Sequence, residues 1–480
     1  MSFTSSAFVG FLAVVFVGLQ QLPSRARLPF LLAANAVFCC WWDWRALLAL
    51  AASTLITFAC AAQIARSRSA GRRNSWLVVN LVGSLGLLGY FKYFDFFAGN
   101  LSSVLASVGI GFSPTLGHIA LPLGVSYYTF QTLSYTLDIY RGQLKPTPSV
   151  LRFAAFASFF PHIVAGPITR ARDFLPQLAR DERADLADVE AGLSRFLQGL
   201  FKKVVVADVL GAYLVDPVFA DPTAYTVAAH WLSVLGYAAQ VYADFSGYSS
   251  MALGVARVLG YRLPENFRYP YLATDIAEFW RRWHITLTRW LREYLWWPLT
   301  KDAPMSGGWR TRLRSRESLV VVFLVCGLWH GATWVFVAWG ALHGLYMVMF
   351  EVWRHRRGGP REPDEAGPRV SHVLPAWLVT QAAVVFSWVL FRSATFRGFH
   401  VFLQGLIGSP GKVAVELTPV VALALLAFLT DHVAGWLMEH REGLRSRVPA
   451  YARAAFYVAL ILLMFHARPE RVSPFIYFQF

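Results

Sequence analysis

The chain has 480 residues, of which 56% are hydrophobic and only 15% are charged. Soluble domains carry about 25% charged residues, so the composition predicts an integral membrane protein rather than a soluble enzyme with one anchor. The net charge of +16 comes from short basic clusters between apolar runs, which is the pattern of cytoplasmic loops. No nucleic-acid-binding module accompanies this charge, so nucleic acid is not expected as a partner.

Apolar stretches predict membrane-spanning helices along the whole chain, because a span needs about 20 apolar residues. The candidates are 7–22, 28–42, 46–65, 76–97, 118–140, 191–214, 227–260, 318–350, 375–391, 415–437 and 451–466. Stretches 227–260 and 318–350 are long enough for a bent or double element. Pro161, Gly166 and Pro167 predict a broken or re-entrant element over 152–168. We therefore expect an all-α integral membrane protein with one polytopic domain, 1–480.

The distribution of basic residues predicts the orientation of the chain. Arginines and lysines follow the third and fifth predicted spans and are dense in 262–316, which places these loops in the cytoplasm. Segment 212–230 has no Lys or Arg and is expected outside. Residues 354–369, rich in Arg, Gly, Pro and Glu, are expected to form a mobile cytoplasmic loop.

Residues 271–297 have the period of an amphipathic helix that lies in the membrane interface. Asp275 and Glu278 form a capping pair at its start. His284 lies on the apolar side of this helix, and Arg281, Arg282 and Arg289 lie on the polar side. A histidine that only bonds a backbone carbonyl beneath the helix would give the same pattern.

A second histidine, His330, interrupts the apolar stretch 318–350, where Gly327 and Gly331 predict a bend. Burial disfavours imidazolium, so His330 is expected to be neutral and able to accept a proton. A core histidine packed between helices remains the alternative, and His343 is interpreted as packing. Asp244 is a carboxylate inside an apolar stretch, suited to orienting a base or to bonding a helix end. No Cys or carboxylate has metal-ligand spacing, so no metal is expected.

Several motifs resemble the membrane-bound O-acyltransferase superfamily, in its bacterial branch of alginate O-acetylation and teichoic acid D-alanylation proteins. The matching motifs are VAGPI (164–168), RDFLPQ (172–177), YADFSGY (242–248), PENF (264–267), FWRRWHI (279–285), WLREY (290–294), WHG (329–331) and PFIYFQF (474–480). The resemblance implies a multi-span helical fold, with about eleven spans plus interfacial and re-entrant helices, around a central funnel.

The resemblance also implies the roles of the site residues. His330 corresponds to the catalytic histidine and His284 to the second important one. Three arginines are expected to attract donor phosphates, although lipid headgroups suit them equally. Trp329 and Asp244 complete the set expected to contact substrate. Residues 300–303 (Thr-Lys-Asp-Ala) differ from the Gly-Gly-Asn-type turn of the family, so the family's contacts at this turn are not carried over to this chain.

The resulting hypothesis is an O-acetyltransferase of the bacterial inner membrane with no bound cofactor. Acetyl-CoA is the expected donor, and a separate periplasmic acetyltransferase is expected to pass the acetyl group to an exopolysaccharide such as alginate. One alternative is D-alanyl or lipid acyl transfer by the same fold. Another is a secondary transporter or proton channel whose histidines relay protons, but such proteins more often show paired broken segments in two repeated halves.

Overall fold

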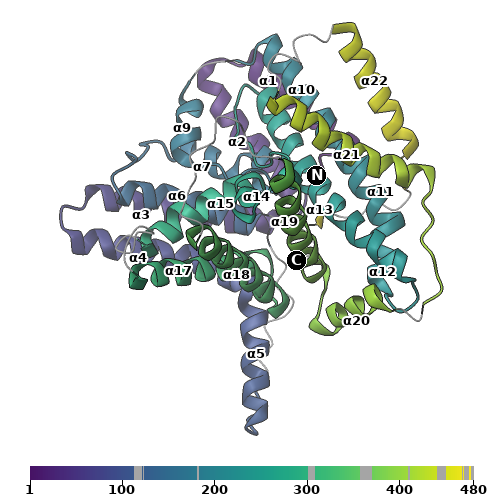
Figure 1. The fold of residues 1–480 in the computed structure, drawn as a ribbon. Helices are drawn as coiled ribbons and strands as arrows, with labels where there is room; N and C mark the ends of the chain where they lie inside the picture. The colour runs from purple at the N-terminus through teal and green to yellow at the C-terminus, as the bar shows by residue number, and fades with distance from the viewer. Residues whose placement is uncertain are drawn as a thin grey trace. The chain divides into compact units, whose positions relative to one another are not determined.

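The computed structural model describes residues 1–112, 122, 124–180, 183–300, 309–356, 370–408, 411–440, 450–467, 469 and 475–476. Helices dominate this part of the chain (Figure 1), which contains no strand and only an isolated backbone bridge between Tyr225 and Val413. The predicted all-α class is confirmed. Residues 118–121, 301–303 and 357–369, on which three of the sequence predictions depend, lie outside the described residues.

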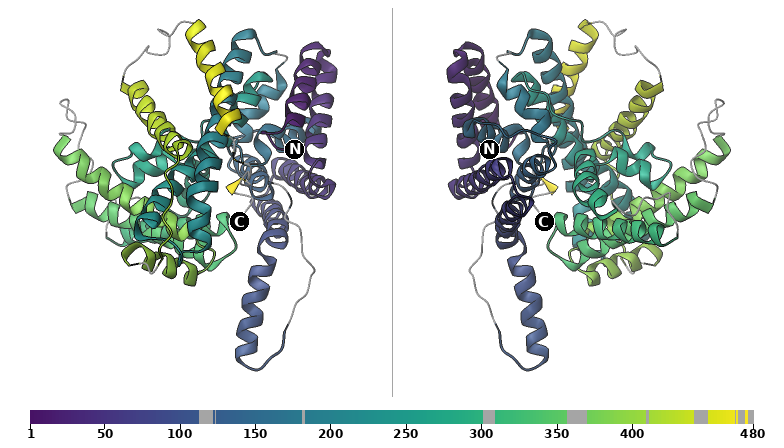
Figure 2. Two further views of the ribbon diagram at one scale, coloured as in Figure 1. Left: turned by 90° about the vertical axis from the view of Figure 1, so that its right-hand side faces the viewer. Right: turned by 90° about the vertical axis from the view of Figure 1, so that its left-hand side faces the viewer.

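The first compact unit comprises Met1–Phe196 and Ala252–Pro264. Side-chain oxygens of Ser5, Asp43 and Ser69 cap the starts of its first, third and fourth helices. Helix α3 packs against both α4 and α6 (Figure 2). The helices are α1 (Ser6–Gln21), α2 (Ser24–Cys40), α3 (Trp44–Arg66), α4 (Ala70–Leu88), α5 (Phe94–Ser107), α6 (Val125–Tyr140), α7 (Val150–Ser158), α8 (Phe160–Ile163), α9 (Ala171–Ala179) and α10 (Leu186–Phe201), whose last turn belongs to the second unit.

The break predicted over 152–168 is confirmed, because α7 ends at Ser158 and the short helix α8 begins at Phe160. His162 lies in α8 and is fully buried. Its Nε2 atom is 3.0 Å from the side-chain nitrogen of Gln131 and 3.2 Å from the carbonyl oxygen of Phe156. Side chains and irregular backbone thus bond each other inside this unit, as a broken element in a membrane protein requires.

The second compact unit comprises Leu197–Met251 and Glu265–Phe480. It contains the residues that the sequence singled out for chemistry. Its helices are α11 (Asp208–Leu210), α12 (Asp216–Ala220), α13 (Val227–Val258, whose last turns belong to the first unit), α14 (Ile276–Arg282), α15 (Ile285–Leu291), α16 (Trp297–Thr300), α17 (Trp309–His330), α18 (Trp334–Arg356), α19 (Val370–Arg392), α20 (Phe396–Ile407), α21 (Pro419–His440) and α22 (Ala450–Ala467).

Of the two forms predicted over 227–260, the double element is wrong, because α13 is one helix of 32 residues, and the bend stays a prediction. Its sequence contains no proline that would interrupt the backbone hydrogen bonds. Gly247 allows close packing. A Cβ atom on Gly247 would lie 2.8 Å from the carbonyl oxygen of Gly199, so two backbones approach each other there.

Five helical segments of the described chain are long and apolar enough to cross a membrane, judged by length and composition. They are Trp44–Arg66, Ala70–Ser107, Trp334–Arg356, Val373–Arg392 and Pro419–Leu437. The shorter apolar helices Ser6–Gln21 and Ala455–Ala467 match the first and last predicted spans. The larger number of spans expected from the sequence stays a prediction, as does the single domain 1–480.

Candidate active site

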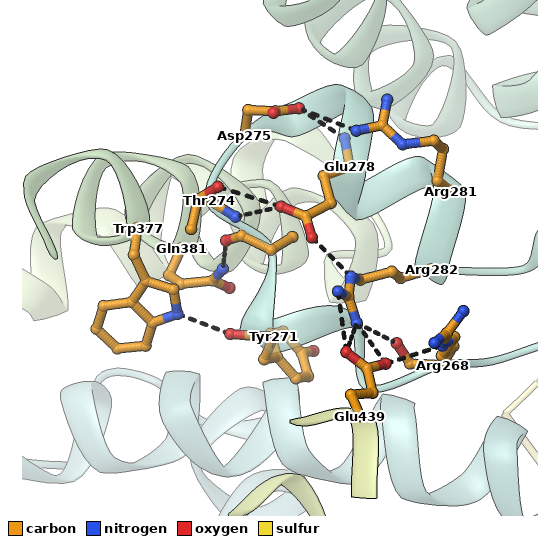
Figure 3. Close-up of polar contacts among 11 residues, drawn as sticks. Arg268, Tyr271, Thr274, Asp275, Glu278, Arg281, Arg282, Trp377, Gln381 and Glu439 are labelled. Atoms are coloured by element: carbon orange, nitrogen blue, oxygen red, sulfur yellow. Dashed lines mark hydrogen bonds and ion pairs between the residues drawn. The ribbon is translucent and has the colours of Figure 1, made fainter. Parts of the chain in front are cut away.

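Helix α14, which leads to His284, begins where the sequence predicts. The carboxylate of Asp275 accepts the backbone N–H of Glu278 at 2.6 Å, and Glu278 accepts the backbone N–H of Thr274 at 2.9 Å (Figure 3). These two bonds take up N–H groups at the helix start that have no partner within the helix. The predicted capping pair of Asp275 and Glu278 is therefore confirmed.

Ion pairs hold the other end of α14. Arg282 Nε lies 2.9 Å from Glu278, and its terminal nitrogens bind both carboxylate oxygens of Glu439 (Figure 3). Arg268 donates to the same carboxylate at 2.8 Å. Burial opposes ionisation of Glu439, but the hydrogen bonds and charge of Arg282, with those of Arg268, outweigh it and lower the pKa of this carboxyl.

The single continuous helix predicted over 271–297 is wrong, because the backbone breaks at His284. Helix α14 ends at Arg282, and α15 begins at Ile285. His284 itself has φ 41° and ψ 52°, the left-handed region that residues other than glycine rarely adopt. The carbonyl oxygen of Asn266 accepts the N–H of Ile285 at 2.9 Å, so a neighbouring segment replaces the missing helical bond. Such strain at a non-glycine residue is typical of functional sites.

Asn266 fixes the orientation and the tautomer of the His284 ring. Its Oδ1 atom accepts the backbone N–H of Thr286, an unambiguous donor, which identifies this atom as the oxygen. The same oxygen lies 3.0 Å from His284 Nδ1, so Nδ1 must carry the proton and Nε2 the lone pair. Asn266 Nδ2 donates to Ser249 at 3.2 Å, which holds the amide in place. Burial lowers the pKa of His284, so its ring is neutral at pH 7.

The structure brings the two predicted histidines to the same tryptophan. His330 is the last residue of α17, and its ring centroid lies 5.1 Å from that of Trp329. The His284 ring lies 5.7 Å from the same indole. Trp339 and Phe391 contact the His330 ring at 5.2 and 5.3 Å. Both histidines are buried from solvent, at 0% and 3% exposure, within one aromatic cluster.

A tight helical hairpin sets the position of His330. The bend predicted in the middle of 318–350 is present as the end of α17 and a short turn before α18, and the two helices lie side by side (Figure 1). A Cβ atom on Gly327 would lie 2.2 Å from the carbonyl oxygen of Phe336, and one on Gly340 would lie 2.2 Å from that of Phe323. Glycine at these positions lets the helices approach closely, which places Trp339 against the His330 ring.

His343 also contacts Trp339 but has a different environment. Its Nε2 atom is 2.9 Å from the hydroxyl of Ser387, and its ring packs at 4.6 Å from Trp339 and 5.2 Å from Trp280. These contacts connect α18 with α14 and α19. They fit the interpretation of His343 as a packing residue.

The sequence of residues 141–358 matches the family model of the membrane-bound O-acyltransferase family. The probable alginate O-acetylase AlgI of Azotobacter vinelandii is 35% identical over 528 residues, which cover the whole of both chains. The chain belongs to the membrane-bound O-acyltransferase family. It is an acyltransferase and a multi-pass membrane protein.

Two further relatives act on other cell-surface polymers, by their names. The peptidoglycan O-acetyltransferase of Helicobacter pylori is 34% identical over 87% of this chain and 81% of its own length. The teichoic acid D-alanyltransferase of Streptococcus thermophilus is 30% identical over 58% of this chain and 68% of its own length.

The three arginines expected near the donor differ in their surroundings in this acyltransferase. Arg281 is exposed and lies 4.0 Å from Asp275. Arg289 is half-buried on α15. Arg282 binds two glutamates, so its guanidinium already has a structural task. The geometry therefore leaves Arg281 and Arg289 better suited than Arg282 to meet a phosphate or a lipid headgroup.

Asp244 engages the protein with both of its carboxylate oxygens. Oδ1 lies 2.8 Å from Lys203 Nζ, and Oδ2 accepts the backbone N–H of Ile476 at 2.7 Å. These contacts favour the positioning role over contact with substrate. Among the described residues, no three His, Cys, Asp or Glu side chains are grouped as metal ligands.

Sequence reasoning assigned no role to Asn266, although the PENF motif that contains it is among the motifs that resemble the family. Asn266 and His284 lie in no common helix, so helical periodicity could not predict their contact. The only signal was its place in this motif. Glu439 was missed for the same reason, because its partners Arg268 and Arg282 lie far away in sequence.

Proposed function

We propose that this acyltransferase O-acetylates an exopolysaccharide of the alginate type, with acetyl-CoA from the cytoplasm as donor. The similarity to alginate O-acetylases over the full length of the chain supports this substrate class. The similarity to a peptidoglycan O-acetyltransferase supports acetyl as the transferred group. The acetyl group crosses the inner membrane through the site and is received by a separate periplasmic acetyltransferase that modifies the polymer.

His330 acts as the general base in this proposal. It takes the proton of an acceptor hydroxyl while that oxygen attacks the thioester carbonyl. The tetrahedral intermediate then collapses: the carbon–sulfur bond breaks, and the thiolate leaves and receives a proton from His330. The new bond is an oxygen ester, and the proton balance closes without a metal or redox cofactor.

His284 positions the acceptor or its hydroxyl proton. Because Nδ1 donates to Asn266, the lone pair of the ring lies on Nε2, which can therefore accept a hydrogen bond from a hydroxyl. This tautomer disfavours stabilisation of a developing oxyanion, which needs a donor. Asn266 thus refines the role that the family resemblance leaves open for His284.

The observation that carries the proposal is the contact of both histidine rings with the indole of Trp329. The test is incubation of the purified protein in detergent with acetyl-labelled acetyl-CoA, with thioester cleavage and acetyl transfer as readouts. His330→Gln should lower the rate by about 10²- to 10⁴-fold, the usual contribution of a general base. His355→Gln, an exposed histidine on α18, is the matched control and should keep the full rate.

Full activity in the His330→Gln protein would refute the assignment of the base. A D-alanyl thioester is tested in parallel as donor, because a teichoic acid D-alanyltransferase is among the relatives. Turnover of this donor but not of acetyl-CoA would replace acetyl by D-alanyl in the proposal. Turnover of neither, with the periplasmic extract supplied, would refute the proposed donor class.

A further inference from the structure

Residues Phe475 and Ile476 are seated on helix α13 beside the active site. The N–H of Ile476 donates to Asp244 at 2.7 Å. The ring of Phe475 packs on Tyr248 at 4.8 Å and on Phe245 at 6.0 Å. Both residues are buried, with 6% and 4% exposure. A backbone donor and an apolar ring therefore anchor this segment at two neighbouring points.

The carboxylate that accepts this N–H is itself held by a buried charge. Lys203 Nζ lies 2.8 Å from Asp244 and 2.8 Å from Asp208, and all three side chains are at most 9% exposed. A buried charge needs a partner, and the contact with Lys203 holds the Asp244 side chain in place. Its second oxygen is thereby fixed in position to accept the short bond from the N–H of Ile476.

The same face of α13 also contacts His284 and Asn266. Residues 244, 245, 248 and 249 follow each other at helical spacing on one side of the helix. Phe245 meets the His284 ring edge-on, with centroids 4.7 Å apart and planes at 88°. Ser249 accepts the bond from Asn266 that fixes the His284 tautomer. One helix face thus contacts the 475–476 segment and the histidine together.

We propose that Asp244, held by Lys203, is a positioning residue that docks the Phe475–Ile476 segment onto α13 and thereby fixes Phe245 against the His284 ring. This role deepens the proposed function and rests on the assignment of His284 to the reaction. Asp244 contacts no reacting atom in this role. It acts through the packing of the docked segment on Phe245.

Removal of the N–H of Ile476 tests the effect on catalysis. Ile476→Pro deletes the donor to Asp244, whereas the matched control Ile476→Val keeps it. With acetyl-CoA as donor, Ile476→Pro should lower kcat on the order of 10- to 100-fold, as expected for a misplaced catalytic group, and leave KM for the donor nearly unchanged. Ile476→Val should retain the kcat of the parent. Equal kcat in both variants would overturn the proposal.

A pH profile separates positioning from a general loss of structure. The His284 ring is packed by uncharged groups, Phe245, Phe267, Trp329 and Asn266, and burial lowers its pKa. Loosening of Phe245 admits water and returns this pKa toward its ordinary value. The acidic limb of the rate profile should therefore move to higher pH in Ile476→Pro. An unchanged limb with a uniformly lower rate would contradict the proposal.

Docking itself is tested without any activity. The Ile476→Cys thiol is labelled with a water-soluble maleimide in a chain whose one exposed cysteine, Cys40, is replaced by serine. Labelling should be slow in this protein and at least tenfold faster when Asp244→Leu is added. Lys202→Met is the control, because Lys202 pairs with Asp431 at 2.9 Å and its loss should leave labelling slow.

The two readouts distinguish the two possible failures. Slow labelling that Asp244→Leu does not change would overturn the docking role whatever the protein catalyses. Labelling that responds to Asp244→Leu in a protein without acetyl transfer would refute the proposed function and leave the docking intact.

Discussion

Replacement of Gly340 by alanine should move Trp339 away from His330, the proposed general base, by a small and calculable distance. The added Cβ would lie 2.2 Å from the carbonyl oxygen of Phe323, whereas an ordinary contact begins near 3.4 Å. The obstacle is backbone, which cannot rotate away, so α17 and α18 must part by about 1 Å. Overpacking of this kind costs about 1–3 kcal/mol of stability. It also moves Trp339, the neighbour of residue 340, away from His330.

The expected kinetic effect is larger than the loss of stability. A displacement of about 1 Å at a catalytic group costs roughly 10²-fold in rate. Acetyl transfer by Gly340→Ala, measured below its melting temperature, should therefore fall by this amount while the protein still purifies as folded. Gly86→Ala is the matched control, since a Cβ atom there meets nothing within 4 Å. If Gly340→Ala retains the parental rate, the hairpin does not set the catalytic geometry.

Three further predictions concern His284 and the helix that precedes it. Asn266→Leu should lower kcat at least tenfold, because His284 loses the acceptor that fixes its tautomer, and an imidazole NMR spectrum should show both tautomers in place of one. The ion pair of Glu439 with Arg282 should make the stability of the protein depend on pH, because it lowers the pKa of Glu439 in the folded state. The added stability is fully present above the ordinary pKa of about 4.5. It is lost as the pH falls through the lower pKa of the folded protein. Melting curves should show Glu439→Gln to be less stable than the parent at pH 7, by about 1 kcal/mol or less, and the difference should vanish in acid. Arg281→Gln should raise KM for acetyl-CoA severalfold without changing kcat if this exposed arginine meets donor phosphate, and an unchanged KM would assign it to the lipid surface instead.

Local patterns were sufficient to predict the all-α class, the cap at Asp275 and the break near Gly331. Each depends on residues within one or two helical turns. The period of 271–297 also predicted the apolar face, but it could not reveal the break at His284. That break depends on Asn266, whose backbone carbonyl replaces the helical acceptor of Ile285. Asn266 lies outside the helix, so this contact leaves no periodic signal in the sequence.

The same limit applies to the site. Both histidines could be singled out because an imidazole in an apolar stretch is unusual. The contact of His284 with Trp329 depends on the packing of the break between α14 and α15 against the end of α17, which no spacing in the chain encodes. Asp244 could be recognised as a buried carboxylate, but its partners Lys203 and Ile476 lie 41 residues before it and 232 residues after it.

The left-handed backbone of His284 has a consequence for every substitution at this position. Alanine there would lose the imidazole and would also adopt a conformation that costs a residue with a Cβ atom roughly 1–2 kcal/mol. Asparagine adopts the left-handed region more readily and keeps a polar side chain, and glycine adopts it freely. Relatives of this chain that had lost the histidine would therefore be expected to carry Asn or Gly at its place, and rarely a branched residue.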